Sequence, residues 1–326
     1  MQALLLLLVL NAWSWTEAGH EVLHGWQPQE GDLLPGELAV VQFDSRPLQS
    51  HSQSYWQAAA RWNRAYCEKH GHQYLFLSSR QPCAQGGVPL AEAWCKVKAM
   101  LEADRLLGLE QGMAQGMAQG MGQGMGQGMG AKAVLFLDSD ALITVNRSMT
   151  TVLSFMQADL NWDPRVKPVA LNQDGPGWAC RYTLGLGYSL CLNSGTVFWV
   201  RGERARALLQ DWWASALSDY ASNRFPPKWR QRWPWEQAQL YEVYGRHRHA
   251  VQVLTFANRS FLPWTSKGNP QSQYPTDAVQ PYCFSHWPGA DCFITHFCAS
   301  LRQKQKMMRQ YALPSDYANV TATYID

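Results

Sequence analysis

Two aspartates at the end of an apolar run are the residues best suited to chemistry. Asp138 and Asp140 follow the run VLFL at 134–137. Because successive side chains of a strand alternate in direction, residues two apart point the same way. Two neighbouring carboxylates repel unless a cation lies between them, and such oxygen ligands suit Mn²⁺ or Mg²⁺. We therefore predict a divalent metal site, which would neutralise a leaving diphosphate. The alternative is that both aspartates only cap or turn the chain.

A short polar segment precedes a second apolar run. Asn193, Ser194 and Gly195 lead into the sequence TVFWV. Small polar residues with a glycine allow a ligand to approach the backbone closely. An ordinary loop that enters a strand has the same composition, so the sequence leaves both interpretations open.

Glu236 and Gln237 follow a proline in a tryptophan-rich stretch. Pro234 favours the start of a helix, which puts both residues in the first turn, where a carboxylate suits the helix dipole. The functional alternative is a carboxylate aimed at a sugar ring with aromatic neighbours. The stretch 229–235 is a candidate platform for an acceptor, with core packing as the alternative for each ring.

His296 lies between apolar residues near the C-terminus. A single histidine in such a place usually has a structural role. It becomes a candidate metal ligand if it faces the same ion as Asp140, because a neutral imidazole suits Mn²⁺.

Strands and helices alternate around these motifs. Strands are predicted at 37–43, 72–77, 132–137, 167–171, 195–200, 250–254 and 293–297, and helices at 54–70, 89–107, 202–220 and 235–244. Such alternation indicates an α/β fold with a mostly parallel sheet flanked by helices. Ligands of such sheets bind beyond the carboxyl ends of the strands, where Asp138 and Asp140 fall.

Residues 111–130 form five tetrapeptides of the type Gln-Gly-Met-Ala/Gly. Glycine recurs too often for a stable helix, and each unit is too small to bury a face. We predict a flexible loop, with a methionine-rich contact surface as the alternative.

Composition and the N-terminus indicate a globular chain in an oxidising compartment. The 326 residues are 46% hydrophobic and 16% charged with a net charge of +3, and no basic run suggests a nucleic-acid partner. The apolar run at 4–10 fits a signal peptide over 1–18, or a short anchor, although no Lys or Arg precedes it. Eight cysteines should pair in part, and sequons occur at Asn146, Asn258 and Asn319. We expect the lumen of the secretory pathway (Golgi or ER), or secretion, and leave membrane association open.

Six segments in this order resemble glycosyltransferase family 34, which comprises galactosyl-, mannosyl- and xylosyltransferases. They read AYCEKHGHQYLF, AEAWCKVKAM, LDSDALI, LNSGTVFWVR, WEQ and THF. The resemblance implies a GT-A nucleotide-sugar fold, which is related to the Rossmann fold. The implied organisation is a leader over 19–36, a GT-A domain over 37–312 that contains the insert, and a tail over 313–326.

The resemblance also implies a role for each motif. Asp140 and His296 would hold the metal, and Asp138 would complete the site and contact the nucleotide-sugar. Glu236 would lie near the anomeric carbon and Gln237 would contact the donor sugar. The segment Asn193–Gly195 would line the donor or acceptor cleft.

The resemblance implies a nucleotide-binding role for Lys96. Members of the family often carry Asp where this chain has Glu236, and a basic residue a few positions after the histidine. Here position 301 is Leu and the nearest cations are Arg302 and then Lys304, so Arg302 is the predicted phosphate ligand.

The predicted function is therefore a retaining glycosyltransferase. It would move a hexosyl or pentosyl unit from a UDP- or GDP-sugar to a glycan or glycoprotein acceptor. A first alternative is an inactive protein of the same fold that binds sugar nucleotides. A second is a phosphotransferase of the haloacid-dehalogenase type, which also places D-x-D after a strand; however, it usually has Thr or Val where this chain has Leu142.

Overall fold

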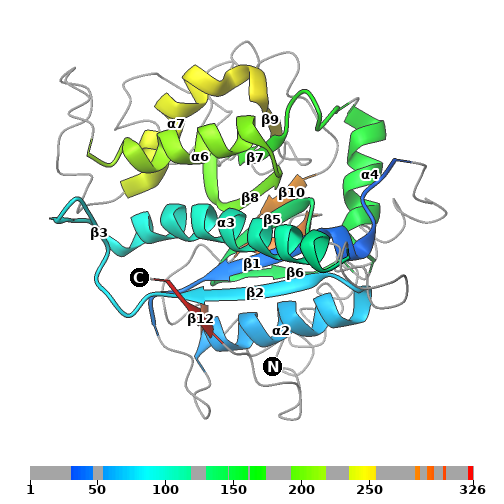
Figure 1. Ribbon diagram of the computed structural model, residues 1–326, viewed down its shortest axis with the longest axis horizontal. Coiled ribbons are helices and arrows are strands. Elements are labelled where there is room, and N and C mark those ends of the chain that lie inside the picture. Colours follow the sequence, from blue (N-terminus) through cyan, green and yellow to red (C-terminus); the bar gives the residue numbers. More distant parts are fainter. Residues whose placement is uncertain are drawn as a thin grey trace, which may run out of the picture.

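The computed structural model places the central part of the chain and several later segments (Figure 1). The structure describes residues 31–46, 54–118, 130–145, 147–160, 162–173, 192–217, 235–254, 283–286, 292–296, 304–305 and 322–325. The predicted signal or anchor, the three sequons, Arg302 and the platform at 229–234 lie outside these residues.

A seven-stranded sheet forms the centre of the molecule. Its strand order is β12-β2-β1-β5-β8-β7-β9. Strand β8 runs antiparallel to both of its neighbours, and every other pairing in the sheet is parallel. The strands are β1 Leu38–Phe43, β2 Gln73–Ser78, β5 Ala133–Asp138, β7 Val169–Gln173, β8 Leu192–Val200, β9 Val251–Leu254 and β12 Ala322–Tyr324. The predicted α/β fold with a mostly parallel sheet is confirmed.

Helices cover both faces of this sheet (Figure 1). Strand β1 is buried along its whole length, so alternate side chains enter two separate cores. On one face Val41 and Phe136 pack with helices α3 (Glu92–Ala118), α6 (Glu203–Ala214) and α7 (Trp235–His247). On the other face Val40 and Leu135 pack with helices α2 (Tyr55–His70) and α4 (Met149–Leu160).

A small second sheet joins the edge where the aspartates lie. Its order is β10 (Cys283–His286), β11 (Cys292–His296) and β6 (Ala141–Ile143). Two residues separate the end of β5 from the start of β6, and β11 pairs antiparallel with β6 so that His296 lies opposite Ala141. This pairing places His296 beside the end of β5, although the two are far apart in the sequence. We predicted β11 from the sequence, but neither β6 nor β10.

A hairpin and two short helical turns complete the described structure. Strands β3 (Ala84–Gln85) and β4 (Val88–Pro89) form the hairpin, and the turns are η1 (Pro35–Glu37) and η3 (Arg248–Ala250). A disulfide joins Cys83, beside the hairpin, to Cys95 in α3, with 5.5 Å between their Cα atoms. It bears out the expectation that some cysteines pair. In the part of the chain that is described, Cys67 is a buried free thiol.

The structure corrects one boundary that bears on the repetitive insert. Helix α3 continues through Gly108 to Ala118, whereas we predicted a helix that stops near 107 and a flexible loop from 111. A helix that is already nucleated propagates easily through Gln, Met and Ala, and each Gly costs only about 1 kcal/mol. The rest of the predicted loop, 119–129, lies outside the described residues. Within the described residues, no helix combines the length and apolarity needed to span a bilayer.

Candidate metal centre

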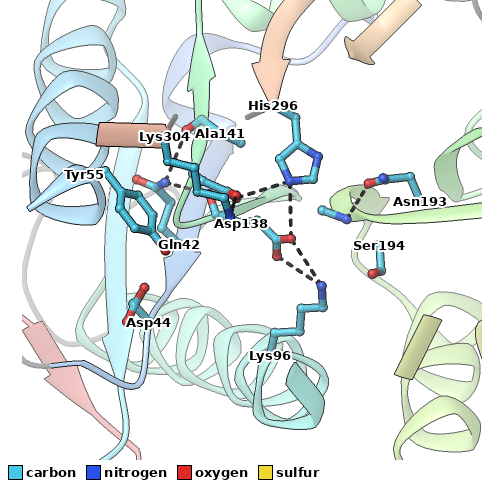
Figure 2. Close-up of polar contacts among 12 residues, drawn as sticks. Gln42, Asp44, Tyr55, Lys96, Asp138, Ala141, Asn193, Ser194, His296 and Lys304 are labelled. Atoms are coloured by element: carbon cyan, nitrogen blue, oxygen red, sulfur yellow. Dashed lines mark hydrogen bonds and ion pairs between the residues drawn. The ribbon is translucent and has the colours of Figure 1, made fainter. Parts of the chain in front are cut away.

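Three potential ligands from two distant parts of the sequence meet at the carboxyl end of β5. Nε2 of His296 lies 3.2 Å from Oδ1 of Asp140 and 3.5 Å from Oδ2 of Asp138 (Figure 2). One ligand atom from each of the three residues lies within 4.8 Å of the others. We call these three residues the metal cluster. The structure thus brings together the residues that the sequence analysis singled out; their role as ligands stays a prediction.

We predicted that Asp138 and Asp140 point the same way because side chains alternate along a strand, but the structure shows a different reason. Asp138 is the last residue of β5, whereas Asp140 lies in the turn that connects β5 to β6. Both side chains reach the same imidazole because the chain turns after Asp138 and because His296 ends a strand paired with β6. The turn itself therefore builds the cluster.

Amide side chains from two other elements hold this turn in place. Gln42 of β1 donates from Nε2 to the carbonyl of Asp138 at 3.1 Å. Asn63 of α2 donates to the carbonyl of Ala141 at 2.8 Å, and its Oδ1 accepts from the backbone N–H of Ile143 at 2.9 Å. Both amides are buried, so their hydrogen bonds are not exchanged with water and fix the backbone firmly. The sequence analysis did not single out either residue.

Two lysines neutralise the aspartates from opposite sides. Nζ of Lys96, in α3, lies 3.2 Å and 3.3 Å from the two carboxylate oxygens of Asp138. Lys304 forms an ion pair and a hydrogen bond with Oδ2 of Asp140. Burial alone would raise the pKa of Asp138, but Lys96 and His296 outweigh it and lower that pKa. For Asp140, burial is likewise outweighed, by His296 and Lys304, and the pKa falls well below its usual range.

Lys96 also connects the metal cluster to Glu236. Its Nζ lies 2.8 Å from Oε1 of Glu236, an atom that also accepts from the hydroxyl of Ser194 at 2.8 Å. Glu236 is 2% exposed, and Oε2 is buried without a hydrogen-bond partner among the described residues. Burial raises the pKa of Glu236, and Lys96 offsets part of that rise. Lys96 thus lies between Asp138 and Glu236, and its nucleotide-side role stays a prediction.

The polar segment beside this group belongs to a strand. Asn193, Ser194 and Gly195 lie in β8, which begins at Leu192, three residues before the predicted start. Oδ1 of Asn193 accepts from the backbone N–H of Gly195 at 2.7 Å. A Cβ at position 195 would lie 2.0 Å from Cε1 of His296, so the glycine makes room for the imidazole. The segment thus supports the metal cluster directly.

Gln237 follows Glu236 in the first turn of α7, as predicted, and is half-buried. The backbone carbonyl of Glu236 accepts from the indole N–H of Trp212 at 2.9 Å, which anchors this turn on α6. The first turn of α7 therefore faces β8 and α6 at the same edge of the sheet as the metal cluster.

The end of β1 adds a second polar group beside Lys304. Asp44 accepts from Nε of Arg46 at 2.7 Å, and Arg46 donates to the hydroxyl of Tyr55 at 2.8 Å. The guanidinium lies 4.0 Å from the ring of Trp56, and the ammonium of Lys304 lies 5.4 Å from the ring of Tyr55. We missed this group, although an Asp directly after an apolar strand is the pattern that identified Asp138.

The residues present fit a hard divalent cation. Two carboxylates suit Mn²⁺ or Mg²⁺, and the added imidazole favours Mn²⁺. The backbone of the turn and the contact with Gly195 hold these donors close together. The ion would be held by Asp138, Asp140 and His296, with its remaining positions open to a ligand or to water.

Neither a scan of protein-family models nor a search of curated proteins gave a match. Solved structures with a similar fold include three glycosyltransferases. One is involved in glycosylation of the major capsid of PBCV-1, with 16% identity, a TM-score of 0.42, and coverage of 84% of this chain and 98% of that one. Mouse xyloside xylosyltransferase 1 has 15% identity, a TM-score of 0.38, and coverage of 81% and 98%. GlyE of Streptococcus pneumoniae TIGR4 has 11% identity, a TM-score of 0.37, and coverage of 85% and 60%. None of these similarities points to glycosyltransferase family 34 in particular, so that assignment stays a prediction.

Proposed function

We propose that this protein is a metal-dependent glycosyltransferase that uses a nucleotide-diphosphate sugar. The observation that supports this best is the metal cluster at the carboxyl edge of the sheet, joined through Lys96 to the buried carboxylate of Glu236. Transfer of a sugar from a nucleotide diphosphate needs a cation for the diphosphate and a polar group that orients the sugar. One end of the site would hold the diphosphate and the other end the sugar.

A bound ion would neutralise the charge that develops on the leaving diphosphate. The residues of the chain do the positioning. Lys96 fixes Asp138 and Glu236 relative to each other, and Ser194 fixes the orientation of the Glu236 carboxylate. Oε2 of Glu236 then remains as a buried acceptor for a hydroxyl group of the sugar. Gly195 keeps the imidazole of His296 against the aspartates.

Several finer features belong to the same proposal. The donor is a UDP- or GDP-sugar, the transferred unit is a hexosyl or pentosyl group, and the acceptor is a glycan or glycoprotein. Transfer with retention of configuration and Mn²⁺ as the ion follow from the resemblance to family 34. A location in the secretory lumen is supported by the apolar N-terminal run and by the disulfide between Cys83 and Cys95.

The test is a donor screen with purified protein and Mn²⁺, in which hydrolysis or transfer is measured for UDP-Gal, UDP-Glc, UDP-Xyl, UDP-arabinose and GDP-Man. Asp140→Ala should lower the turnover by about 100-fold or more, because it removes a ligand of the ion. Asp163→Ala is the matched control, since Asp163 lies on the surface and pairs with Arg165. Equal turnover of Asp140→Ala and wild type would remove the metal from the mechanism.

One observation favours a second candidate function, a protein that binds a sugar nucleotide without turning it over. Glu236 is almost fully enclosed, and one of its oxygens is already committed to Lys96 and Ser194. Calorimetry with UDP and Mn²⁺, run beside the donor screen, separates the two candidates. Binding of UDP without turnover of any of the five donors would favour the binding protein.

A further inference from the structure

Lys304 occupies the place beside Asp140 that a cation would share. Its ammonium contacts Oδ2 of Asp140, while His296 lies 3.2 Å from Oδ1 of the same carboxylate. The side chain of Lys304 is 20% exposed, so it lies at the outer margin of the cluster, over the ring of Tyr55 (Figure 2). The carboxylate of Asp140 is therefore neutralised by the chain itself.

A divalent ion at the cluster changes this balance of charge. Asp138, Asp140 and Glu236 supply three carboxylates, and Lys96 and Lys304 supply two ammonium groups. An ion held by Asp140 would stand within a few ångströms of the ammonium that contacts the same carboxylate. Like charges at such a separation repel strongly in a poorly solvated site.

The two lysines differ in what they can do when an ion enters. Lys96 keeps Glu236 at 2.8 Å even if Asp138 turns toward the ion, and its side chain is 12% exposed. The acidic partner of Lys304 in the cluster is Asp140, to which the ion would bind, and the side chain of Lys304 is 20% exposed. Lys304 is the cation that an incoming ion displaces more easily.

We propose that Lys304 is an internal counter-cation that competes with the divalent ion for Asp140 and, once displaced, pairs with the anionic ligand that the ion binds. This inference rests on the proposed function, because that function supplies the diphosphate. Displacement gives the metal and the diphosphate a positive coupling: each binds more tightly when the other is present, because Lys304 then has a new partner. Without a diphosphate, Lys304 weakens the binding of the metal.

Calorimetric titrations of the full chain test this coupling. Mn²⁺ is titrated into the metal-free protein, and UDP is titrated into the metal-free and the Mn²⁺-loaded protein. The variant Lys304→Met removes the ammonium and keeps the length of the side chain, and Lys304→Arg keeps the charge. Lys132→Met is the matched control, because Lys132 pairs with Glu37, at the start of β1 rather than at its carboxyl end. Thermal unfolding of each variant verifies that it folds.

Competition by Lys304 predicts opposite changes in two affinities. Lys304→Met should bind Mn²⁺ alone at least about fivefold more tightly than wild type. Mn²⁺ should strengthen UDP binding by a smaller factor in Lys304→Met than in wild type. Lys304→Arg and Lys132→Met should both behave like wild type in these titrations.

Two other results would overturn the inference in distinguishable ways. If folded Lys304→Met binds Mn²⁺ with unchanged or lower affinity, Lys304 does not compete with the ion, and the proposed function stands. If neither wild type nor Lys304→Met binds Mn²⁺, the metal cluster holds no ion, and the inference and the proposed function both fail.

Discussion

Gly195 lies so close to His296 that a Cβ at position 195 would come within 2.0 Å of Cε1 of the imidazole and within 2.7 Å of both ring nitrogens. Real side chains do not approach so closely, so any other residue at 195 must push the ring aside. Nε2 of the imidazole contacts both aspartates, and displacement of the ring would open the metal cluster.

Gly195→Ala should therefore weaken metal binding without removing a ligand. We expect the affinity for Mn²⁺ to fall by about 10- to 100-fold, as for other residues that orient a metal ligand. Calorimetric titration with Mn²⁺ gives the measurement. Gly245→Ala is the control, because Gly245 lies in α7 and a Cβ there meets no atom within 4 Å. An unchanged affinity in Gly195→Ala would mean that His296 is not a ligand.

Lys96 is the centre of a buried charge network, so its loss should cost stability. Lys96→Met leaves Glu236 with a buried carboxylate that has lost its cation, which we expect to lower the free energy of unfolding by about 3–5 kcal/mol. Adding Glu236→Gln removes that charge and should restore part of the loss. Denaturant unfolding in the presence of a chelator gives the measurement.

A control for the Lys96→Met measurement lies on the same helix. Lys98→Met, two residues further along α3, should change the free energy of unfolding by less than about 0.5 kcal/mol. If Lys96→Met is no less stable than Lys98→Met, the network around Glu236 contributes no net stability.

The metal cluster could be predicted from the sequence because its ligands are Asp and His residues at the ends of clearly apolar strands. Asp138 ends β5, and His296 ends β11, as the apolar runs around them indicate. Sequence reasoning could not show how they meet, because β6 is only three residues long and too short to give a periodic signal. Gly195 was interpreted as space for a ligand, whereas the structure gives that space to an imidazole contributed by a strand 100 residues later.

The supporting residues were harder to predict than the ligands. Gln42 and Asn63 are polar residues in a strand and a helix, and nothing local shows that they turn inward to hold another loop. Helix α4 was missed because its first turns contain Thr150, Thr151 and Val152, and β-branched residues weaken the helical signal. The inward orientation of Gln42 and Asn63 and the formation of α4 depend on tertiary packing, which the local sequence does not show.

Arg201 joins the two segments that flank the repetitive insert, one in α3 and one just before β5. Its Nη1 donates to the carbonyls of Leu107 at 3.2 Å and Ala131 at 2.8 Å, and its Nε lies 3.2 Å from Asp104. Residues on both sides of the insert therefore meet at one guanidinium, and the side chain of Arg201 is 8% exposed. These contacts of Arg201 do not depend on residues 111–129. Deletion of 111–129 should therefore leave stability and metal binding nearly unchanged.

Arg201→Met should lower the free energy of unfolding by about 3–5 kcal/mol, because it leaves the buried Asp104 with one cation fewer and removes both carbonyl contacts. Arg201→Lys should restore little, since an ammonium cannot reproduce the planar set of donors. Denaturant unfolding of each variant, with and without the deletion, checks both statements. A large loss of stability from the deletion alone would show that the insert supports the fold.

His70 should make the protein less stable as the pH falls below neutrality. Burial, with the nearby charges of Lys69 and His72, lowers the pKa of His70 to about 4, and its Nε2 is buried without a hydrogen-bond partner among the described residues. The unfolded chain has a histidine pKa of about 6.5, so between pH 6.5 and 4 the unfolded state binds more protons than the folded state. The contribution of His70 to stability is thus complete above pH 6.5 and is lost as the pH falls toward 4.

His70→Gln removes this ionisable group and should flatten that part of the pH profile. The measurement is the midpoint of urea unfolding at several pH values from 7 to 4.5, compared as the difference between variant and wild type. Carboxylates with a lowered pKa, such as Asp140, act equally in both proteins and cancel in this difference. His249→Gln, at an exposed position, is the control. Parallel profiles for wild type and His70→Gln would mean that His70 is protonated as readily in the folded protein as in the unfolded chain.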